Sequence, residues 1–159
     1  ADRRDRRHHL PHFAEQRMTP TKDAAVINYY ANHPDIRPFI GGDGELDLSN
    51  AIYDPHVALF GEFGGFVLSW TAPETYEVHT LIAPEGRGQW AFDFAKLAIA
   101  HMVSIGASHL WTRVKPEHRH TAIFTRKMGF KPCGQVLTDF GFGAETYNLY
   151  DWRMPCQQQ

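Results

Sequence analysis

The sequence has little cysteine, no long apolar run and no strong excess of charge of either sign. Its two cysteines, Cys133 and Cys156, make neither a disulfide framework nor a metal-binding spacing, so a reduced, cytoplasmic setting fits best. No apolar stretch approaches the roughly 20 residues that a membrane-spanning helix needs, so we expect no membrane partner. The net charge of −2 argues against a strongly electrostatic partner for the whole surface.

Motifs of two classes of enzyme are also missing. There is no Gly-x-Ser-x-Gly sequence and no convincing Cys–His pair, which disfavours hydrolase chemistry. His118 and His120 lie two residues apart and would face apart on a helix, so we expect no metal site. What is present is a chain of 159 residues, 43% of them hydrophobic, without internal repeat or linker. Such a chain favours one domain with a sizeable core.

The first residues carry an uneven charge, because residues 2–9 read DRRDRRHH. A solvated tail is the simplest interpretation. The alternatives are an arm that grips nucleic acid, an acidic protein surface, or further copies in a homo-oligomer or other protein assembly. The near-neutral total charge argues against nucleic acid as the main partner. We therefore expect a basic arm over 1–11, one domain over 12–153 and a tail over 154–159.

The first third of the domain predicts short elements separated by proline and glycine. Residues 10–18 suit a first strand. Thr21 suits the N-cap of a helix that ends before Pro34, because the residue preceding a proline is pushed out of the helical region. Residues 46–52 suit one or two helical turns.

A β-hairpin is expected next. Strands over 56–63 and 66–70 flank Gly64-Gly65, a pair typical of a two-residue hairpin turn. A second turn over 72–74 leads to the following strand. We expect these strands to be antiparallel neighbours.

The rest of the chain is organised around one strand, one turn and one helix. Side chains over 76–83 alternate with the period of a strand, and Pro84 stops it because proline has no N–H to donate. A glycine-containing turn follows over 85–88. From Trp90 the apolar residues take the helical period, and Gly106 suits the C′ position of that helix.

The following strand, over 109–114, is expected to lie parallel to residues 78–82, with the helix as a right-handed crossover. A last helix over 119–128 is closed by Gly129. The final hairpin has strands over 135–139 and 146–153 around a loop over 140–143.

The turn before the long helix is a candidate anion site. The first N–H groups of a helix have no partner inside it, and the helix dipole places partial positive charge there. Arg87 adds a full positive charge. Many such junctions bind nothing, so the turn alone leaves anion binding and a purely structural role equally open.

Four stretches of the chain agree with one known family in order and spacing. They are PEGRG at 84–88, SHLWTRV at 108–114, HRHTAIFTRKMGFKPCG at 118–134 and RMTPTKDAAVINYY at 17–30. They resemble the cofactor loop, the next strand, the closing helix and the opening elements of the GNAT superfamily of acyl-CoA-dependent N-acyltransferases. The resemblance covers roughly 12–153. It implies an α/β (α+β) fold with a mixed, mostly antiparallel central sheet, helices on both faces and a splayed parallel strand pair.

The resemblance also implies a function and a site. The function is transfer of an acyl group from acyl-CoA, most simply acetyl-CoA, to an unknown amine acceptor, by direct attack in a ternary complex. The base that removes the proton of the amine would be Glu77 or His79. Thr125 takes the position from which the family often protonates the thiolate. The residues expected to bind the cofactor are Leu81, Ile82, Ala83, Arg87, Gly88, Gln89, Trp90, Ala91 and His118.

Several residues depart from the family's pattern. Trp90 and Phe92 stand where the cofactor loop normally has small residues, and Trp90 would either cover the phosphate site or pack beneath the helix. Thr125 replaces a frequent Tyr, and His118 a usual Asn. The altered loop looks most like a GNAT-like branch encoded by tailed bacteriophages. The alternative function is therefore a catalytically silent structural or binding protein, for example a virion component, located in the host cytoplasm or the virion.

Overall fold

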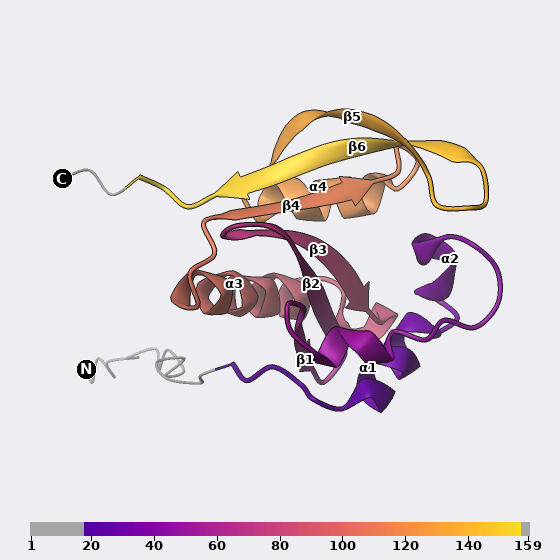
Figure 1. Cartoon of the computed structure of the whole chain (residues 1–159), viewed down its shortest axis with the longest axis horizontal. Helices are drawn as coiled ribbons and strands as arrows, with labels where there is room; N and C mark the ends of the chain where they lie inside the picture. Colours follow the sequence, from indigo (N-terminus) through magenta and orange to yellow (C-terminus); the bar gives the residue numbers. More distant parts are fainter. Residues whose placement is uncertain (1–17, 157–159) are drawn as a thin grey trace, which may run out of the picture.

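The computed structural model describes residues 18–156, which form a six-stranded sheet with helices on both of its faces (Figure 1). The strand order is β1-β2-β3-β4-β6-β5. The strands are β1 (Val57–Gly61), β2 (Gly64–Ala72), β3 (Thr75–Ile82), β4 (His109–Val114), β5 (Lys131–Asp139) and β6 (Ala144–Arg153). The helices are α1 (Ala24–Ala31), α2 (Arg37–Ile40), α3 (Gln89–Ser104) and α4 (Arg119–Lys127), with the 3-10 turns η1 (Ser49–Ile52) and η2 (Pro84–Gly86).

The sheet is the mixed, mostly antiparallel one that the sequence predicted. Every pair of neighbouring strands is antiparallel except β3 and β4, which run parallel. These two strands pair only between residues 75–77 and 109–111, and not over residues 78–82 as predicted. No residue pair follows Glu77 and Trp111, and beyond them the two strands separate (Figure 1).

Two apolar cores lie on the two faces of the sheet. One core packs α3 and α4 against the face that carries Leu68 and Leu110. The other packs α1, α2 and η1 against the opposite face, around Ile27 and Val67. Each fully buried side chain of this kind contributes about 1.5–3 kcal/mol to stability. The alternation of side chains along the strands therefore holds both helical layers.

The turn of the first hairpin lies two residues earlier than predicted. It is formed by residues 62–63, and Gly64 and Gly65 belong to β2. A Cβ atom on Gly64 would lie 2.0 Å from the carbonyl oxygen of Leu81, and one on Gly65 would lie 1.9 Å from that of Leu59. Both glycines are needed because neighbouring strands approach closely here, and Gly64 also has a φ angle of 119°, which favours glycine.

Helix α1 begins after Asp23, so the prediction of Thr21 as the N-cap was wrong. The carboxylate of Asp23 accepts a hydrogen bond from the N–H of Ala25 at 2.9 Å, which is the N-cap interaction. The hydroxyl of Thr21 instead accepts from the N–H of Asp23 at 3.2 Å. The basic arm and the strand predicted over 10–18 fall outside the described residues, apart from Met18, which is in no strand.

The elements around α3 follow the sequence prediction closely. β3 ends before Pro84, and α3 lies between Gly88 and Gly106, whose φ angles are 104° and 102°. Such positive φ angles favour glycine. The helix after β4 is closed by Gly129, with φ of 91°. The strands of the last hairpin begin earlier than predicted, β5 at Lys131 by four residues and β6 at Ala144 by two.

No helix within residues 18–156 is both long enough and apolar enough to cross a bilayer. In the same part of the chain, no three His, Cys, Asp or Glu side chains converge on a possible metal position. Cys133 and Cys156 are exposed and free.

Candidate active site

β3 presents backbone groups without strand partners where it separates from β4. The carbonyl oxygen of Val78 accepts a hydrogen bond from the hydroxyl of Thr112 at 2.9 Å, so this carbonyl faces β4. Backbone direction alternates along a strand, so Thr80 and Ile82 direct their backbone groups to the same side. The gap between the separating strands is therefore lined by N–H and C=O groups that a ligand could bind.

Leu81 and Ala83, which were predicted to bind a cofactor with Ile82, direct their backbone away from this gap. Leu81 pairs with Gly65 of β2. The N–H of Ala83 donates to the carbonyl of Phe63 at 2.8 Å, and its carbonyl accepts from the N–H of Gly86 at 3.0 Å. Of the three residues only Ile82 directs its backbone groups to the gap, and a cofactor role of Leu81 and Ala83 stays a prediction.

The start of α3 presents backbone N–H groups that lack acceptors. The N–H of Arg87 donates to Pro84, and the first N–H with a helical acceptor is that of Phe92, which donates to Gly88 at 3.2 Å. Between them, the N–H groups of residues 88–91 find no acceptor in the part of the chain that the structure describes. Together with the helix dipole, these groups can bind an anion.

Trp90 packs beneath the helix, which is one of the two arrangements that the sequence left open. Its ring stacks on that of Phe94 with 4.8 Å between centroids and meets Phe63 edge-on at 5.3 Å. Gly61 and Gly86 leave room for the indole, because a Cβ atom on either would lie 3.0 Å from it. The indole therefore packs against the β1–β2 hairpin and η2 and leaves the N–H groups of the helix uncovered.

Phe92 also contributes to packing. Its ring lies 5.1 Å from that of Phe124 on α4, between ring centroids, and Lys127 Nζ lies 5.7 Å from its centre. The side chain thus connects α3 to α4 on the apolar side of the sheet. Trp90 and Phe92, both near the start of α3, therefore pack against other elements and leave the first N–H groups of the helix uncovered.

Glu77 and His79 lie on one face of β3, opposite the face that packs on α3 and α4. Arg113 of β4 donates to both oxygens of the buried Glu77 carboxylate, through Nε at 2.7 Å and Nη2 at 3.0 Å. The guanidinium also lies over the rings of Trp111 and Phe140, at 5.3 and 4.7 Å from their centroids. Since both oxygens of Glu77 are held in a bidentate ion pair, Glu77 is better suited to positioning a neighbouring group than to accepting a proton itself.

His79 combines contact with solvent and a depressed pKa. Its Nε2 lies 3.8 Å from Oε2 of Glu77, too far for a hydrogen bond, and 45% of its side chain is exposed. Partial burial lowers the pKa of His79 below its usual range, and the charge of Glu77 partly opposes this. Nearby Arg113 and His56 lower the pKa further. A neutral imidazole can accept a proton, so His79 is the better placed base of the two.

Thr125 lies on α4 and faces the same separation of the strands as Thr80. Its hydroxyl donates to the carbonyl of Thr121 at 2.8 Å. The hydroxyl is therefore satisfied within the helix. It can protonate or stabilise a leaving group only if this bond opens.

His118 precedes α4 and contacts α2. Its ring lies 4.7 Å from that of Phe39, between ring centroids, and its side chain makes no capping hydrogen bond to the helix. Burial lowers the pKa of His118. A role of His118 at the cofactor stays a prediction, since its observed neighbour is the short helix across the cleft.

Residues 35–44, which we call the strap, run along the open end of the separating strands. The guanidinium of Arg87 donates to the carbonyl of Asp35 at 2.9 Å, which ties the strap to the turn before α3. At the other end the ring of Phe142, from the β5–β6 loop, lies against Gly41, where a Cβ atom would be 3.0 Å away. The strap thus joins segments that are far apart in the chain.

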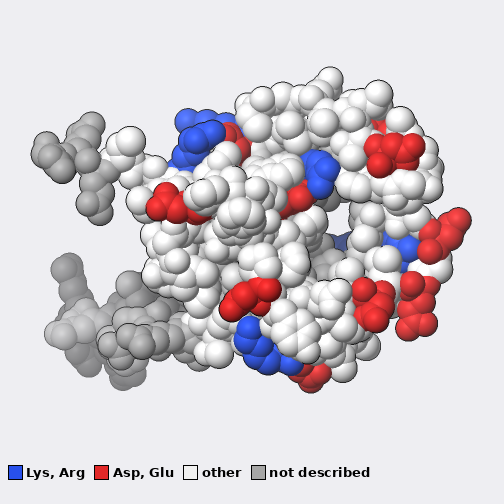
Figure 2. Space-filling model, viewed as in Figure 1, with Lys and Arg blue, Asp and Glu red and all other residues white. Residues whose placement is uncertain are grey.

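The strap is held in shape by Arg37. Its Nε donates to the carbonyl of Gly44 at 2.8 Å and its Nη1 to that of Gly41 at 2.7 Å. Figure 2 shows an opening through the molecule beside these segments, with acidic side chains on both sides of it. Exposed acidic residues of the strap, the segment after it and the β5–β6 hairpin are Asp35, Asp43, Glu45, Asp47 and Asp139.

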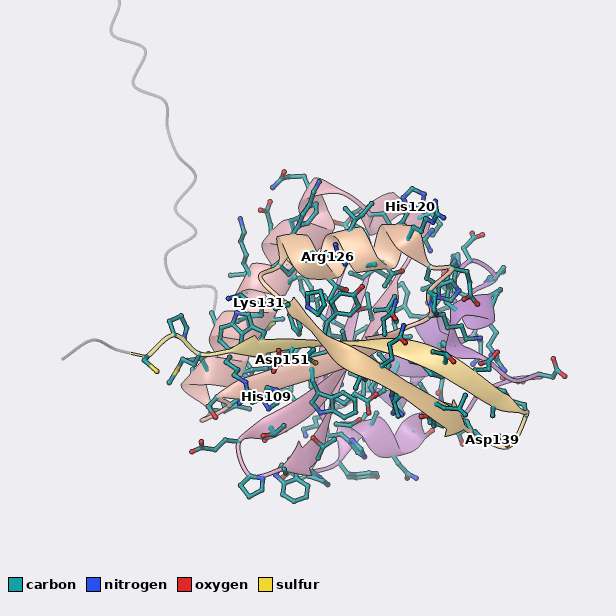
Figure 3. All side chains as sticks on the ribbon, turned by 90° about the horizontal axis from the view of Figure 1, so that it is seen from above. His109, His120, Arg126, Lys131, Asp139 and Asp151 are labelled. Carbon is teal, nitrogen blue, oxygen red and sulfur yellow. The ribbon has the colours of Figure 1, made fainter. Side chains whose placement is uncertain are left out.

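The far part of the same sheet face is polar, and its charges are paired. The ammonium group of Lys115 donates to one carboxylate oxygen of Glu145 at 2.9 Å, and the hydroxyl of Tyr147 donates to the other at 3.1 Å. Further along, Nε2 of His109 and Oδ2 of Asp151 lie 3.2 Å apart on β4 and β6 (Figure 3). The charges of this part of the face are therefore paired with one another.

Sequence reasoning missed Arg113 and the strap. Part of the signal for Arg113 was present, because alternation in HLWTRV places it on the same face as Trp111. That Glu77 lies beside this face follows only from the observed register of β3 and β4. With that register, Arg113 lies two residues beyond the strand partner of Glu77 and on the same face, which predicts an ion pair. The contacts of the strap left no comparable signal, since they join distant loops.

Comparison with known proteins finds similar structures but no similar sequence families. No protein-family model matches the sequence, and no curated protein matches it. A putative acetyltransferase from Salmonella typhimurium, solved with its cofactor acetyl-CoA, superposes with a TM-score of 0.66 at 15% identity over 90% of this chain and 95% of that one. A probable GNAT-family acetyltransferase from Chromobacterium violaceum gives 0.65 at 15% identity over 86% and 81%. The chain has the GNAT fold.

A third structure with the GNAT fold extends the comparison. An acetyltransferase of the GNAT family from Bacillus anthracis gives a TM-score of 0.63 at 20% identity, over 86% of this chain and 92% of that one. Each comparison covers most of both chains, so the likeness extends well beyond the β3-α3-β4 unit. The fold expected from the sequence is therefore confirmed.

Proposed function

We propose that the chain is an acyl-CoA-dependent N-acyltransferase that transfers an acyl group, most simply acetyl, to an amine by direct attack in a ternary complex. One juxtaposition carries this proposal: the N–H groups of residues 88–91, which find no acceptor within residues 18–156, lie at the start of α3, the α-helix that follows the separating strand β3. A ligand with an anionic group and an extended arm could use both features. The likeness in fold to an acetyltransferase solved with acetyl-CoA supports the same interpretation.

The residues present fit such a ligand. The N–H groups of residues 88–91 would bind its pyrophosphate, and no atom lies within 4 Å of a Cβ position on Gly88, so there is room for it. Arg87 donates one N–H to the strap and has others with which to add positive charge. Backbone groups of Thr80 and Ile82 would pair with the pantetheine arm. When bound, the acyl-CoA supplies a thioester carbonyl and a thiolate leaving group.

His79 is the proposed general base. Overall, the transfer breaks a C–S bond, forms a C–N bond and frees a proton from the amine, which needs an acceptor. The lowered pKa of His79 keeps its imidazole neutral and able to take that proton. Glu77, held by Arg113, is then a positioning residue whose negative charge stabilises the imidazolium as it forms.

No protein group is assigned to protonate the thiolate. An ordinary thiol has a pKa of about 8.5, so the thiolate can leave as an anion and take its proton from water. Thr125 was predicted to help at this step. Its bond to Thr121 would first have to open, so a catalytic role of Thr125 stays a prediction.

Calorimetric titration with acetyl-CoA tests the proposal. We expect saturable binding and, at about 100 times the Kd, a stabilisation of about 2.7 kcal/mol. Arg87→Ala should weaken binding because it removes charge beside the site. Lys96→Ala, which removes an exposed cation from the side of α3, should leave binding unchanged. Wild-type protein that binds neither CoA nor acetyl-CoA would overturn the proposal.

A catalytically silent structural or binding protein, such as a virion component of a tailed bacteriophage, stays the alternative hypothesis. The main reason for this hypothesis was that the large side chains of Trp90 and Phe92 could cover the cofactor site. Both side chains pack away from the N–H groups at the start of α3, which weakens this reason. Assembly through the basic arm concerns residues outside the described part. Turnover by a monomeric protein that lacks residues 1–9 would exclude the alternative.

A further inference from the structure

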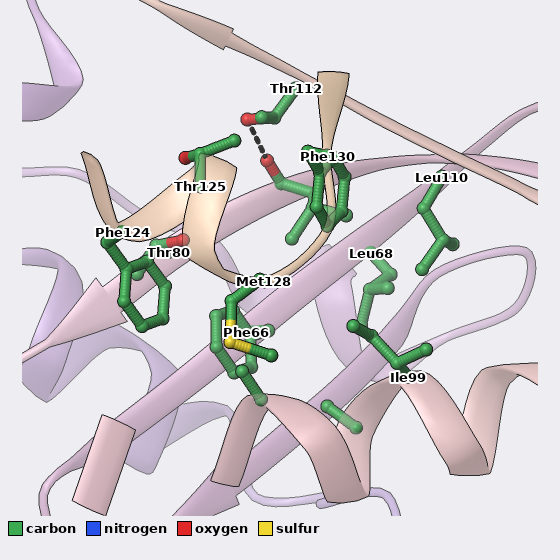
Figure 4. Close-up of a pocket in the computed structure, with 13 residues that line it drawn as sticks. Phe66, Leu68, Thr80, Ile99, Leu110, Thr112, Phe124, Thr125, Met128 and Phe130 are labelled. Atoms are coloured by element: carbon green, nitrogen blue, oxygen red, sulfur yellow. Dashed lines mark hydrogen bonds between the residues drawn. The ribbon is translucent and has the colours of Figure 1, made fainter. Parts of the chain in front are cut away.

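An apolar cavity lies between the sheet and the helices α3 and α4 (Figure 4). Its volume is about 40 Å³. β2, β3 and β4 form one wall, and α3 and α4 form the other. None of the residues that line it carries a titratable side chain. The cavity is separate from the polar face that carries His79, because it lies on the opposite side of β3.

The cavity begins where the strands part. Thr80, which is exposed, lines its outer end. Thr112, whose hydroxyl is bonded to the carbonyl of Val78, stands where the pairing of β3 and β4 has already ended. The lining then runs inward to Leu68 and Leu110, which are 2% and 1% exposed. The space is therefore a blind pocket that leads from the strand separation into the core.

Two of the three hydroxyl groups around the cavity are already used, and the third, that of Thr80, lies at the exposed outer end. The hydroxyl of Thr112 donates to Val78, and that of Thr125 donates to Thr121. A water molecule in a cavity needs two to four polar partners, whereas apolar cavities stay dry and accept apolar ligands. The chemistry of the walls therefore favours hydrocarbon over water or a charged group.

We propose that this cavity binds the acyl chain of the donor, and that the preferred donor carries a short chain of three or four carbons rather than acetyl. This inference rests on the proposed function. One water-sized group needs about 10–15 Å³ of such a volume, so about 40 Å³ accepts about three groups. Three groups correspond to the two methylenes and the methyl of butyryl. Acetyl would leave most of the cavity empty, and chains beyond butyryl would exceed it.

Binding measured without an acceptor amine tests the proposal apart from turnover. CoA and its acetyl, propionyl, butyryl, hexanoyl and octanoyl thioesters are titrated into the wild-type protein in a calorimeter. Each methylene that becomes buried should tighten binding by about fourfold, so butyryl-CoA should bind about fifteenfold tighter than acetyl-CoA. Hexanoyl-CoA should show no further gain.

The wild-type series separates two failures. If neither CoA nor any thioester binds, the proposed function is wrong. If CoA and acetyl-CoA bind but affinity stays flat from acetyl to butyryl, the function survives and the acyl cavity is wrong. A steady gain through octanoyl would also overturn it, because a closed pocket of this size must saturate.

Substitutions on α3 locate the effect. Ala98 lines the cavity and is 4% exposed, whereas Ala100 is on the exposed side of the same helix. Ala98→Leu should remove the advantage of butyryl-CoA and leave the affinity for CoA unchanged, and the matched Ala100→Leu should change neither. If Ala98→Leu weakens CoA as much as butyryl-CoA, the cavity holds the pantetheine arm and the proposal is overturned.

A second variant covers the possibility that Ala98→Leu does not fold. Ile99 also lines the cavity, and Ile99→Ala enlarges it. The tightest thioester should then shift from butyryl toward hexanoyl. An unchanged order of affinities in folded Ile99→Ala protein would overturn the proposal.

Discussion

The two faces of β3 present opposite environments to the gap between the strands. Toward α3 and α4, Val78 and Thr80 line an apolar cavity without titratable groups. Toward the strap, Glu77 and His79 lie beside the guanidinium of Arg113. Successive side chains on a strand point to opposite faces. Adjacent residues of one strand therefore serve a dry compartment and a polar one that water reaches.

This difference suits the two substrates of an acyl transfer. An acyl chain gains free energy by leaving water for apolar walls. An amine must lose a proton, which requires a titratable group in a polar environment. The separation of β3 from β4 lets the two compartments meet at one place. If they act independently, a change on one face should affect one substrate and spare the other.

The largest expected effect is that of His79→Ala. Removal of a general base typically costs about 10²–10⁴-fold in kcat, and the affinity for the acyl donor should not change because His79 lies on the other face. Steady-state kinetics with the best acceptor, together with calorimetric titration of the donor, measure both. His120→Ala, on the exposed side of α4 (Figure 3), is the matched control. Full kcat in His79→Ala protein would show that the base lies elsewhere.

Arg113→Met should cause the next largest effect, on stability. It leaves the buried Glu77 carboxylate without its partner, which for a well-buried pair costs about 3–5 kcal/mol. The Arg113 side chain is 21% exposed, so we expect about 2–3 kcal/mol. Urea denaturation measures the loss. The double variant Glu77→Gln/Arg113→Met should recover most of it, because no unpaired charge remains. A single variant as stable as the wild type would mean that the pair contributes nothing.

The two ends of α3 offer a smaller and sharply matched comparison. Gly88 and Gly106 have nearly equal φ angles, 104° and 102°, and no atom lies within 4 Å of a Cβ on either. Alanine at each should cost about 1–3 kcal/mol through backbone strain, because both positions have positive φ angles that favour glycine. Only Gly88→Ala places a methyl group beside the free N–H groups, so it alone should weaken CoA binding. Equal CoA affinity in both variants would place the anion site elsewhere.

Much of the fold was predictable because its signals are local. Alternation over 76–83, the stop at Pro84 and the glycine after α3 lie within one continuous stretch. The turn predicted at Gly64-Gly65 failed for a physical reason. Glycine serves both for turning and for close approach of strands, and only the neighbouring carbonyls of Leu59 and Leu81 decide between the two.

Those features of the candidate site that lie within one strand or one helix were also predictable, whereas contacts between distant segments were not. The shared face of Glu77 and His79 and the N–H groups of residues 88–91 follow from the period of one strand and the start of one helix. The partner of Glu77 and the contact of Phe142 with the strap depend on segments brought together by the fold. Such contacts require the pairing of β3 with β4 to be known first.

The smallest expected effect is a change in the pH dependence of kcat/KM, and its sign tests the electrostatics of the polar face. Protonated His79 cannot accept a proton, so kcat/KM should fall as pH drops through the pKa of His79. Glu77 raises this pKa and Arg113 lowers it. Glu77→Gln should therefore move the acid limb to lower pH, whereas Arg113→Met should move it to higher pH. Shifts in the same direction, or a limb that neither variant moves, would assign that limb to another group.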